Sequence, residues 1–93
     1  MVYAYVNMNI TQPESLAKYR EHAAAALSKY GGAVLVAGKE NQVIEGNANV
    51  PDMAAILTFP DKDAALSWIN DSELAEVHQM RQGAGDVSIV LIG

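Results

Sequence analysis

Three segments of this chain read as β-strands that are apolar on both faces: 33–37, 53–59 and 87–92. In the second of them, Met53, Ala55 and Leu57 alternate with Ala54 and Ile56. Helices can cover only one face of an open sheet, so an apolar second face of this size needs another cover. The simplest cover is a second copy of the chain, packed sheet against sheet about a two-fold axis. The sequence therefore predicts a homodimer.

The length of the chain points in the same direction. Ninety-three residues make one small domain, which we expect to span residues 1–93. A core of that size is thin and leaves much apolar surface wet in a monomer. Yet 51% of the residues are hydrophobic, slightly more than a small soluble domain needs.

Charge and composition exclude several classes of function. The net charge of −5 would repel a phosphate backbone, so we expect no nucleic-acid partner. Cysteine is absent, which rules out disulfides, thiolate metal sites and cysteine nucleophiles. No apolar run approaches the roughly 20 residues of a membrane span, and the first residues lack the basic start of a signal peptide. We therefore expect a cytoplasmic protein without a membrane partner.

The order of the expected elements predicts the fold. A strand at 2–8 is followed by a helix that opens at Pro13 and ends at Gly31-Gly32. Strands at 33–37 and 53–59 come next, then a helix with a second start signal at Asn70-Asp71, and a last strand from Asp86. This order predicts an α+β, ferredoxin-like βαββαβ fold with an antiparallel sheet and a second helix that is split in two.

Some local patterns leave two readings open. Tyr3, Tyr5 and Asn7 share one face of the first strand, where they either lie at a half-wet interface or orient a ligand. Gly38 marks a bend or bulge after which 42–45 resumes the strand, or a turn between two short strands.

Other polar residues have a simpler explanation. Asp61 and Asp63 suit a helix N-terminus better than a metal site, and we expect no metal. In the first helix, His22 should lie on the surface and Arg20 at the flank of the buried stripe. Gly83-Ala84-Gly85 follows a helix rather than a strand, which indicates a cap and turn and not a phosphate loop.

The second half-helix carries the pattern most suggestive of chemistry. On a wheel of 100° per residue, His78 and Arg81 share the apolar face of Leu74 and Val77. A guanidinium in such a stripe must find a partner. It could bond last-turn carbonyls or a carboxylate such as Glu45, as a structural group. Alternatively it could be an anion clamp beside a histidine able to act as acid or base.

The chain resembles the family called domain of unknown function 1330, within the dimeric α+β barrel superfamily. The resemblance covers nearly the whole chain and rests on Tyr19, Gly31-Gly32, Gly38, Glu45-Gly46, Phe59-Pro60, Ala64-Ala65-Leu66-Ser67-Trp68, Asp71-Ser72-Glu73, Arg81 and Gly93. It implies a ferredoxin-like fold and a homodimer but no reaction. The superfamily includes cofactor-independent monooxygenases, lactone isomerases, haem enzymes and ligand-sensing domains, so the fold does not settle the function.

Two positions depart from the family pattern. Leu74 stands where the family tends to have an aromatic residue, and Asp52-Met53 where it tends to have a basic one. If either position lines a pocket, the ligand of this chain differs from that of its relatives. We expect no cofactor, and haem in particular is disfavoured, because neither His22 nor His78 lies in a haem motif.

Two hypotheses follow. In the first, Arg81, His78 and Glu45 form a catalytic or binding site for a small anionic or aromatic metabolite, helped by Tyr5, Asn7 and Tyr19. Arg81 would hold an anionic or enol oxygen, and His78 or Glu45 would move a proton in an isomerisation or a cofactor-free oxygenation. In the second, the chain is a non-catalytic dimer module, and these residues are structural.

Overall fold

The computed structural model describes all 93 residues and contains one four-stranded antiparallel sheet in the order β2-β3-β1-β4. The elements along the chain are β1 (Val2–Ile10), α1 (Pro13–Ser28), β2 (Ala33–Gly38), β3 (Met53–Phe59), α2 (Lys62–Asn70), the 3₁₀ turn η1 (Ser72–Leu74), α3 (Ala75–Gln82) and β4 (Gly85–Ile92). This is the predicted ferredoxin-like arrangement, and its strand order places β1 and β3 at the centre.

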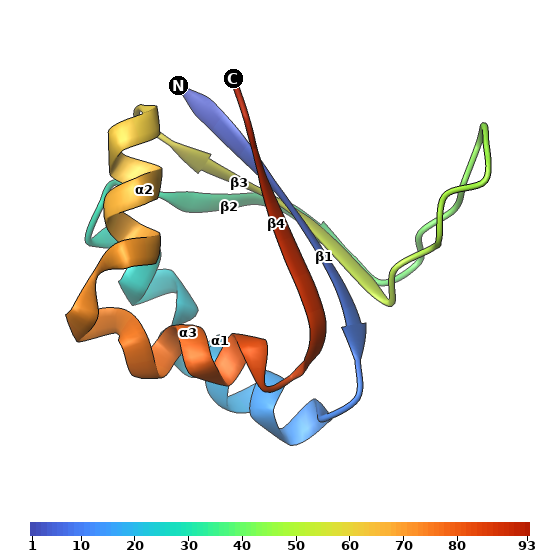
Figure 1. Ribbon diagram of the computed structural model, residues 1–93, viewed down its shortest axis with the longest axis horizontal. Helices are drawn as coiled ribbons and strands as arrows, with labels where there is room; N and C mark the ends of the chain where they lie inside the picture. The colour runs from blue at the N-terminus through green and yellow to red at the C-terminus, as the bar shows by residue number, and fades with distance from the viewer.

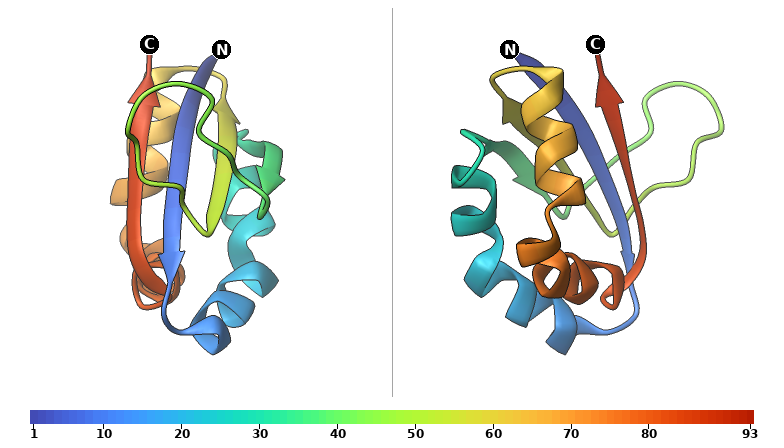
Figure 2. Two further views of the ribbon diagram at one scale, coloured as in Figure 1. Left: turned by 90° about the vertical axis from the view of Figure 1, so that its right-hand side faces the viewer. Right: turned by 60° about the vertical axis from the view of Figure 1, so that its left-hand side comes forward.

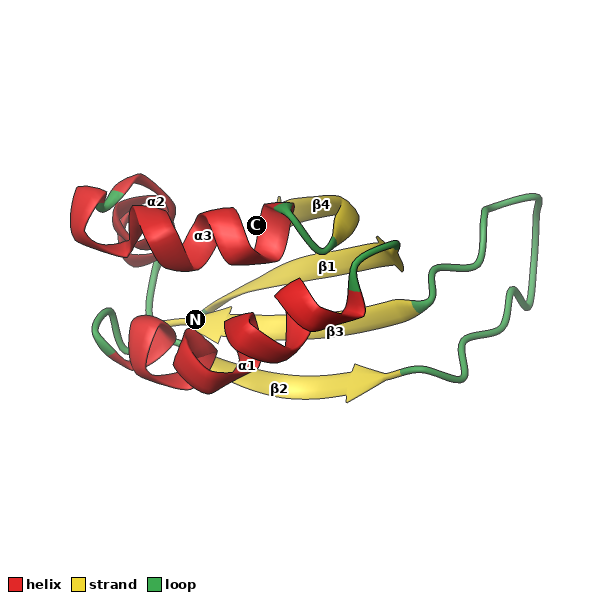
Figure 3. Ribbon diagram, turned by 90° about the horizontal axis from the view of Figure 1, so that it is seen from below, coloured by secondary structure: helices red, strands yellow, loops and turns green.

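All helices lie on one side of the sheet, so the molecule has two layers (Figure 1). Seen from below, α1 runs along β2 and β3, while α3 lies beside it toward β4 (Figure 3). Alternation along β1 turns Ala4, Val6 and Met8 toward the helices, as the sequence pattern predicts. They join a core between the two layers made of Leu16, Leu27, Leu57, Phe59, Ala65, Trp68 and Ala84. None of the helices combines the length and the hydrophobicity that a membrane span requires.

The other face of the sheet carries no helix, and only the loop after β2 reaches the part of it around Tyr5 and Ala54. In Figure 2 (left) the strands stand in front of the helices, and this open face is turned toward the viewer. The strand register places Tyr5 between Ile56 on β3 and Val90 on β4, with Val36 beyond Ile56. Val36, Val90 and Ile92 are 56%, 55% and 52% exposed. The predicted second apolar face is therefore present.

The turn after α1 explains why two glycines precede β2. Gly31 adopts a φ of +71°, in the left-handed region that favours glycine. A Cβ atom on Gly31 would lie 2.9 Å from the Pro60 ring, and one on Gly32 would lie 2.8 Å from the Phe59 ring. The two glycines thus let the chain turn tightly against the end of β3.

The predicted split of the second helix is confirmed at residue 71. The carboxylate of Asp61 accepts the backbone N–H of Ala64 at 2.8 Å and caps α2, as expected of a helix start. Asp71 repeats this role for η1 by accepting the N–H of Glu73 at 2.8 Å. The two caps bend the chain so that α3 can lie against α1.

One predicted strand is absent: residues 42–45 belong to a long loop that projects beyond the ends of β2 and β3, away from the helices (Figure 1). Gly38 pairs with Ala54 near the start of β3, so residues beyond 38 have no neighbouring strand to bond. The expected irregularity in β2 does occur, but it lies between Val34 and Val36 instead of at Gly38.

Candidate functional site

A cavity of about 200 Å³ lies between α1 and the helix-facing side of the sheet. Of its 14 lining residues, 12 are hydrophobic, and the remaining two are arginines. The apolar wall comes from Val6, Met8, Leu16, Tyr19, Ala23, Leu27, Val34, Ala37, Met53, Ala55, Leu57 and Ile89. A concave, mostly apolar space with a few polar groups is the usual form of a small-molecule site.

Arg81 is the most unusual residue of this wall. It is only 2% exposed, although the cavity that it lines is almost entirely apolar. Its guanidinium lies over two aromatic rings, with Cζ at 5.0 Å from the centroid of Trp68 and 5.6 Å from that of Tyr19. Such cation–π contacts stabilise a buried charge only in part.

The guanidinium forms one side-chain hydrogen bond and no ion pair. Its Nη1–H donates to Nδ1 of His78 at 2.9 Å. The ion pairs of the chain involve Lys29 instead of Arg81. A guanidinium carries five N–H donors, and a buried charge is normally paired. Arg81 therefore has donors available for an acceptor in the cavity.

Both ring nitrogens of His78 are engaged. Nε2 lies 2.8 Å from the Trp68 carbonyl oxygen, which can only accept, so Nε2 carries the hydrogen. Nδ1 then offers its lone pair to Arg81, which can only donate. The two contacts fix a neutral tautomer, and His78 holds the guanidinium in place through its own bond to α2.

The environment of His78 favours the same neutral state. Burial lowers the pKa of His78, and the nearby positive charge of Arg81 lowers it further, while the Trp68 carbonyl acts in the opposite direction. With its lone pair and its N–H both used, this side chain is a positioning group for Arg81. The arrangement does not present it as a proton carrier toward the cavity.

Trp68 joins these groups from α2, although the sequence analysis names it only as part of the family resemblance. Its indole meets the His78 ring edge-on at 4.7 Å between centroids and meets Phe59 at 5.5 Å. Its carbonyl receives the His78 hydrogen bond, and its ring faces Arg81. Its Nε1 is buried without a hydrogen-bond partner. The sequence signal was the single tryptophan on the inward face of α2.

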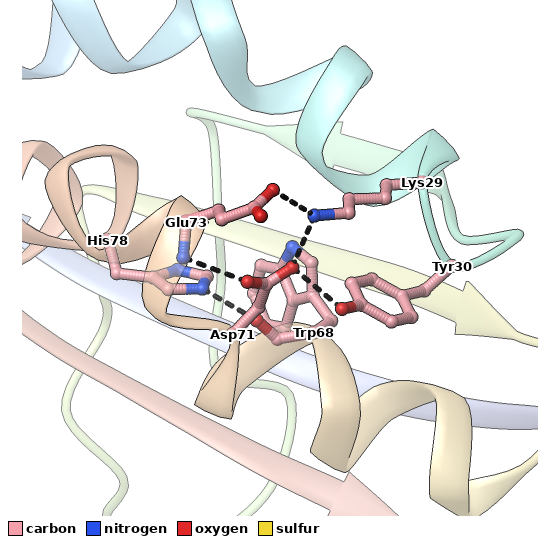
Figure 4. A network of polar contacts seen from close by, with 6 residues as sticks. All are labelled: Lys29, Tyr30, Trp68, Asp71, Glu73 and His78. Atoms are coloured by element: carbon pink, nitrogen blue, oxygen red, sulfur yellow. Dashed lines mark hydrogen bonds and ion pairs between the residues drawn. The ribbon is translucent and has the colours of Figure 1, made fainter.

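A second polar cluster lies at the junction of α1 and η1 (Figure 4). We call Lys29, Tyr30, Asp71 and Glu73 the junction cluster. Asp71 Oδ2 accepts from the Lys29 ammonium at 2.7 Å and from the Tyr30 hydroxyl at 2.6 Å, and Glu73 accepts from Lys29 at 3.0 Å. These hydrogen bonds lower the pKa of Asp71 to about 2 and raise that of Lys29 above its usual value.

The structure brings together three of the residues proposed for a site and separates the other three. Arg81 and Tyr19 line the cavity, and His78 contacts Arg81 without lining the cavity itself. Tyr5 and Asn7 are on the open face, with the sheet between them and Arg81.

Glu45 is exposed on the projecting loop, where it lines a different hollow together with Tyr5. The suggested Arg81–Glu45 pair is therefore wrong for a single chain. The reason is that residues 42–45 do not continue the sheet.

Arg20 is a cavity residue that sequence reasoning left at the flank of α1. It is exposed, as expected, yet it lines the cavity beside Leu16 and Ala23. Its position one residue after Tyr19 was the available signal, because the flank of a buried stripe borders any space beneath the helix. His22 is on the surface, as predicted.

Comparisons with known proteins agree with this architecture. A family model described as domain of unknown function (DUF1330) matches residues 1–93. No curated protein shows significant sequence similarity to the chain.

Solved structures share the fold at low identity. A protein of unknown function from Rhodopseudomonas palustris, RPA0582, is 19% identical with a TM-score of 0.76, over 98% of this chain and 79% of that one. At3g17210 from Arabidopsis thaliana is 14% identical with a TM-score of 0.72, over 100% and 94%. A dimeric ferredoxin-like protein of unknown function from Jannaschia sp. CCS1 is 12% identical with a TM-score of 0.67, over 99% and 97%.

Proposed function

The chain belongs to the DUF1330 family, and we propose that it is a homodimer in which each subunit binds one small amphipathic molecule in the cavity beside Arg81. The observation that carries this proposal is the guanidinium of Arg81. It is 2% exposed, has no carboxylate partner and borders an apolar cavity. A bound acceptor group would supply the missing partner.

The two parts of the site suit the two parts of such a ligand. The apolar wall accepts a hydrophobic or aromatic body, which gains stability from leaving water. Arg81 accepts an oxygen that carries negative charge, because hydrogen bonds to ionised groups are the stronger ones. His78 and Trp68 already hold the guanidinium in place, so little conformational entropy is lost when the ligand binds.

Binding is better supported than proton transfer. Arg81 could stabilise an enolate oxygen in an isomerisation or a cofactor-free oxygenation. Such a reaction also needs a base near the substrate. His78 uses both nitrogens elsewhere, and Glu45 lines another hollow. The non-catalytic alternative, a dimer module that binds a ligand, agrees better with these contacts.

The open face supports the dimer. Val36, Val90 and Ile92 are each more than half exposed on it, and an apolar surface of this kind is typical of an interface. The Jannaschia protein, which shares the fold, is described as dimeric. Tyr5 and Asn7 would then lie at the contact between two sheets, where a tyrosine can be half wet.

A thermal-shift screen with small aromatic and aliphatic carboxylates tests the ligand site, since a ligand that binds only the native state raises its melting temperature. Ala23→Phe fills the cavity, whereas Ala24→Phe places the same side chain on the exposed side of α1. We expect ligand-induced stabilisation to disappear in the first variant and to persist in the second. Equal stabilisation of both variants would exclude the cavity as the site.

Sedimentation at micromolar concentration tests the dimer. Val90→Lys places a charge on the open face, and Leu66→Lys places one on α2, at positions that are 55% and 47% exposed. We expect a monomer for the first variant and a dimer for the second. A wild-type chain that sediments as a folded monomer would contradict the proposed assembly. The cytoplasmic location and the lack of a nucleic-acid partner stay predictions.

A further inference from the structure

Three of the six positively charged side chains of this acidic chain lie at the cavity or at the hollow next to it. The sequence has six lysines and arginines against eleven acids. Both arginines line the cavity, and no aspartate or glutamate does. An uncharged ligand would gain little from two arginines in the wall of the cavity. The local charge therefore favours an anion, although the chain as a whole would repel one.

A second hollow adjoins the cavity. It is lined by Ile10, Pro13, Leu16, Arg20, Lys39 and Asp52. Leu16 and Arg20 line both spaces, and we call this hollow the mouth of the cavity. Arg20 and Lys39 are exposed cations at the mouth. The one acid there, Asp52, accepts the backbone N–H of Ile10 at 2.8 Å.

The size of the cavity limits the body of the ligand. An engineered apolar cavity of about 150 Å³ holds one benzene molecule. The cavity beside Arg81 measures about 200 Å³. It therefore has room for one substituted aromatic ring, or for a chain of about six to eight carbons by the same comparison. A ligand of several fused rings would exceed this volume.

The charge of the ligand follows from the single buried cation. One guanidinium can pair one carboxylate through two parallel hydrogen bonds. A second negative charge beside the first would find no second buried cation, because Arg20, the other charged lining residue, is exposed, and this makes a dianion costly.

We propose that the ligand is a small monocarboxylate with an apolar body of this size, which enters between Arg20 and Lys39 and is held at Arg81. This inference rests on the proposed function and names the class of molecule that the same site takes.

Matched pairs of compounds test the charge by isothermal titration. Octanoate and para-toluate carry a carboxylate, and octanamide and para-toluamide are their neutral counterparts of nearly equal shape. We expect the carboxylates to bind the wild-type protein at least about tenfold more tightly, because one charge-assisted hydrogen bond gives that ratio. In Arg81→Met the preference should vanish while the amides still bind.

The outcomes separate this inference from the proposed function. Amides that bind as tightly as the acids, and lose binding in Ala23→Phe, would overturn the monocarboxylate and leave the cavity as a binding site. Tighter binding of the dianion suberate than of octanoate would also overturn it. Should none of the four compounds bind, the inferred class is wrong. Because the comparison uses the wild-type protein, it holds even where Arg81→Met fails to fold.

Association kinetics test the mouth. Replacing Arg20 and Lys39 together by Gln should slow octanoate association severalfold at low salt and flatten its salt dependence, with little change in the dissociation rate. Replacing Lys18 and Lys62 by Gln removes the same charge from exposed positions that line neither hollow. An equal slowing in this control would show that only net charge matters and would overturn the proposed entrance.

Discussion

The protein contains two polar clusters in its helical layer, and they are built in opposite ways. In the junction cluster, the Lys29 ammonium meets two carboxylates and the Tyr30 hydroxyl meets one of them. Around Arg81, the cation meets a neutral imidazole and two aromatic rings. In the first cluster every charged group has an oppositely charged partner, and in the second a buried cation has none.

This difference separates a structural role from a binding role. A balanced pair near solvent ties α1 to η1 and requires nothing further. A buried cation without an anion costs stability, and a bound anion would offset that cost. Arg81 borders the one space in which a small partner could lie against it. Variants at the two clusters should show whether they differ in this way.

The largest effect should come from giving Arg81 the acid that it lacks. Tyr19 lies beneath the guanidinium, with its ring centroid 5.6 Å from Cζ. Tyr19→Glu would place a carboxylate there, and Tyr19→Gln is the uncharged control of the same shape. We expect the carboxylate to weaken octanoate binding about a hundredfold relative to the control, as loss of a buried ionic contact does. Titration calorimetry gives the dissociation constant of octanoate for both variants. Equal constants would show that Arg81 does not need an acidic partner.

His78 should matter for stability more than for any proton transfer. His78→Gln can keep a donor near the Trp68 carbonyl, and His78→Asn can keep an acceptor near Arg81. Each variant loses the other buried hydrogen bond, so the free energy of unfolding measured in urea should fall by about 1–3 kcal/mol. Octanoate binding should weaken more in His78→Gln, whose guanidinium has lost its support. Equal octanoate affinities in the two variants would show that His78 does not position Arg81.

The two clusters should lose stability in different pH ranges. Burial lowers the pKa of His78, so the unfolded chain binds a proton more readily, and stability falls as pH drops below the usual histidine value of 6.5. The pKa of Asp71 falls from 3.8 to about 2, so its contribution persists above 3.8 and is lost between these values. The raised pKa of Lys29 adds a loss only in strong alkali.

Melting curves from pH 7 to pH 2 by circular dichroism would resolve the two acidic ranges. Asp71→Asn should abolish the lower one and keep the upper one, where the loss should grow slightly because the Asp71 charge raises the pKa of His78. If the melting temperature falls in only one pH range, and Asp71→Asn abolishes that fall, then His78 is not held neutral by the fold.

The smallest effect should come from Lys29→Met. Lys29 is an exposed side chain in a solvent-screened ion pair, and such pairs contribute little. We expect the melting temperature to fall by only a few degrees and octanoate affinity to stay unchanged. The shift should shrink in high salt, where the wild-type pair is screened as well. A loss of affinity would mean that the junction cluster also shapes the cavity.

Much of the fold could be predicted from local patterns. Alternation along residues 2–8 indicated which face of β1 is buried, because side chains in a strand point to opposite faces. The acids at positions 61 and 71 indicated where the second helix starts and where it splits, because a cap needs only its own neighbours. The segment 42–45 misled, because a strand also needs a neighbour, which no local pattern reveals.

The candidate site could be predicted only in part. A helical wheel places His78 and Arg81 on one face, since they are three residues apart on the same helix. It cannot reveal that the His78 lone pair turns to Arg81 instead of toward a substrate. Tyr19 and Arg20 are about sixty residues away in the sequence, and only the contact between α1 and α3 brings them to the same cavity.

The amino-acid order by itself determined the βαββαβ succession, the caps and the doubly apolar strands, because each depends on residues within a few positions of one another. The tertiary structure decided which charges have partners. Whether Arg81 meets Glu45, a histidine or an empty apolar space depends on how the layers pack, and charge compensation acts through space over a few ångströms, regardless of separation along the chain.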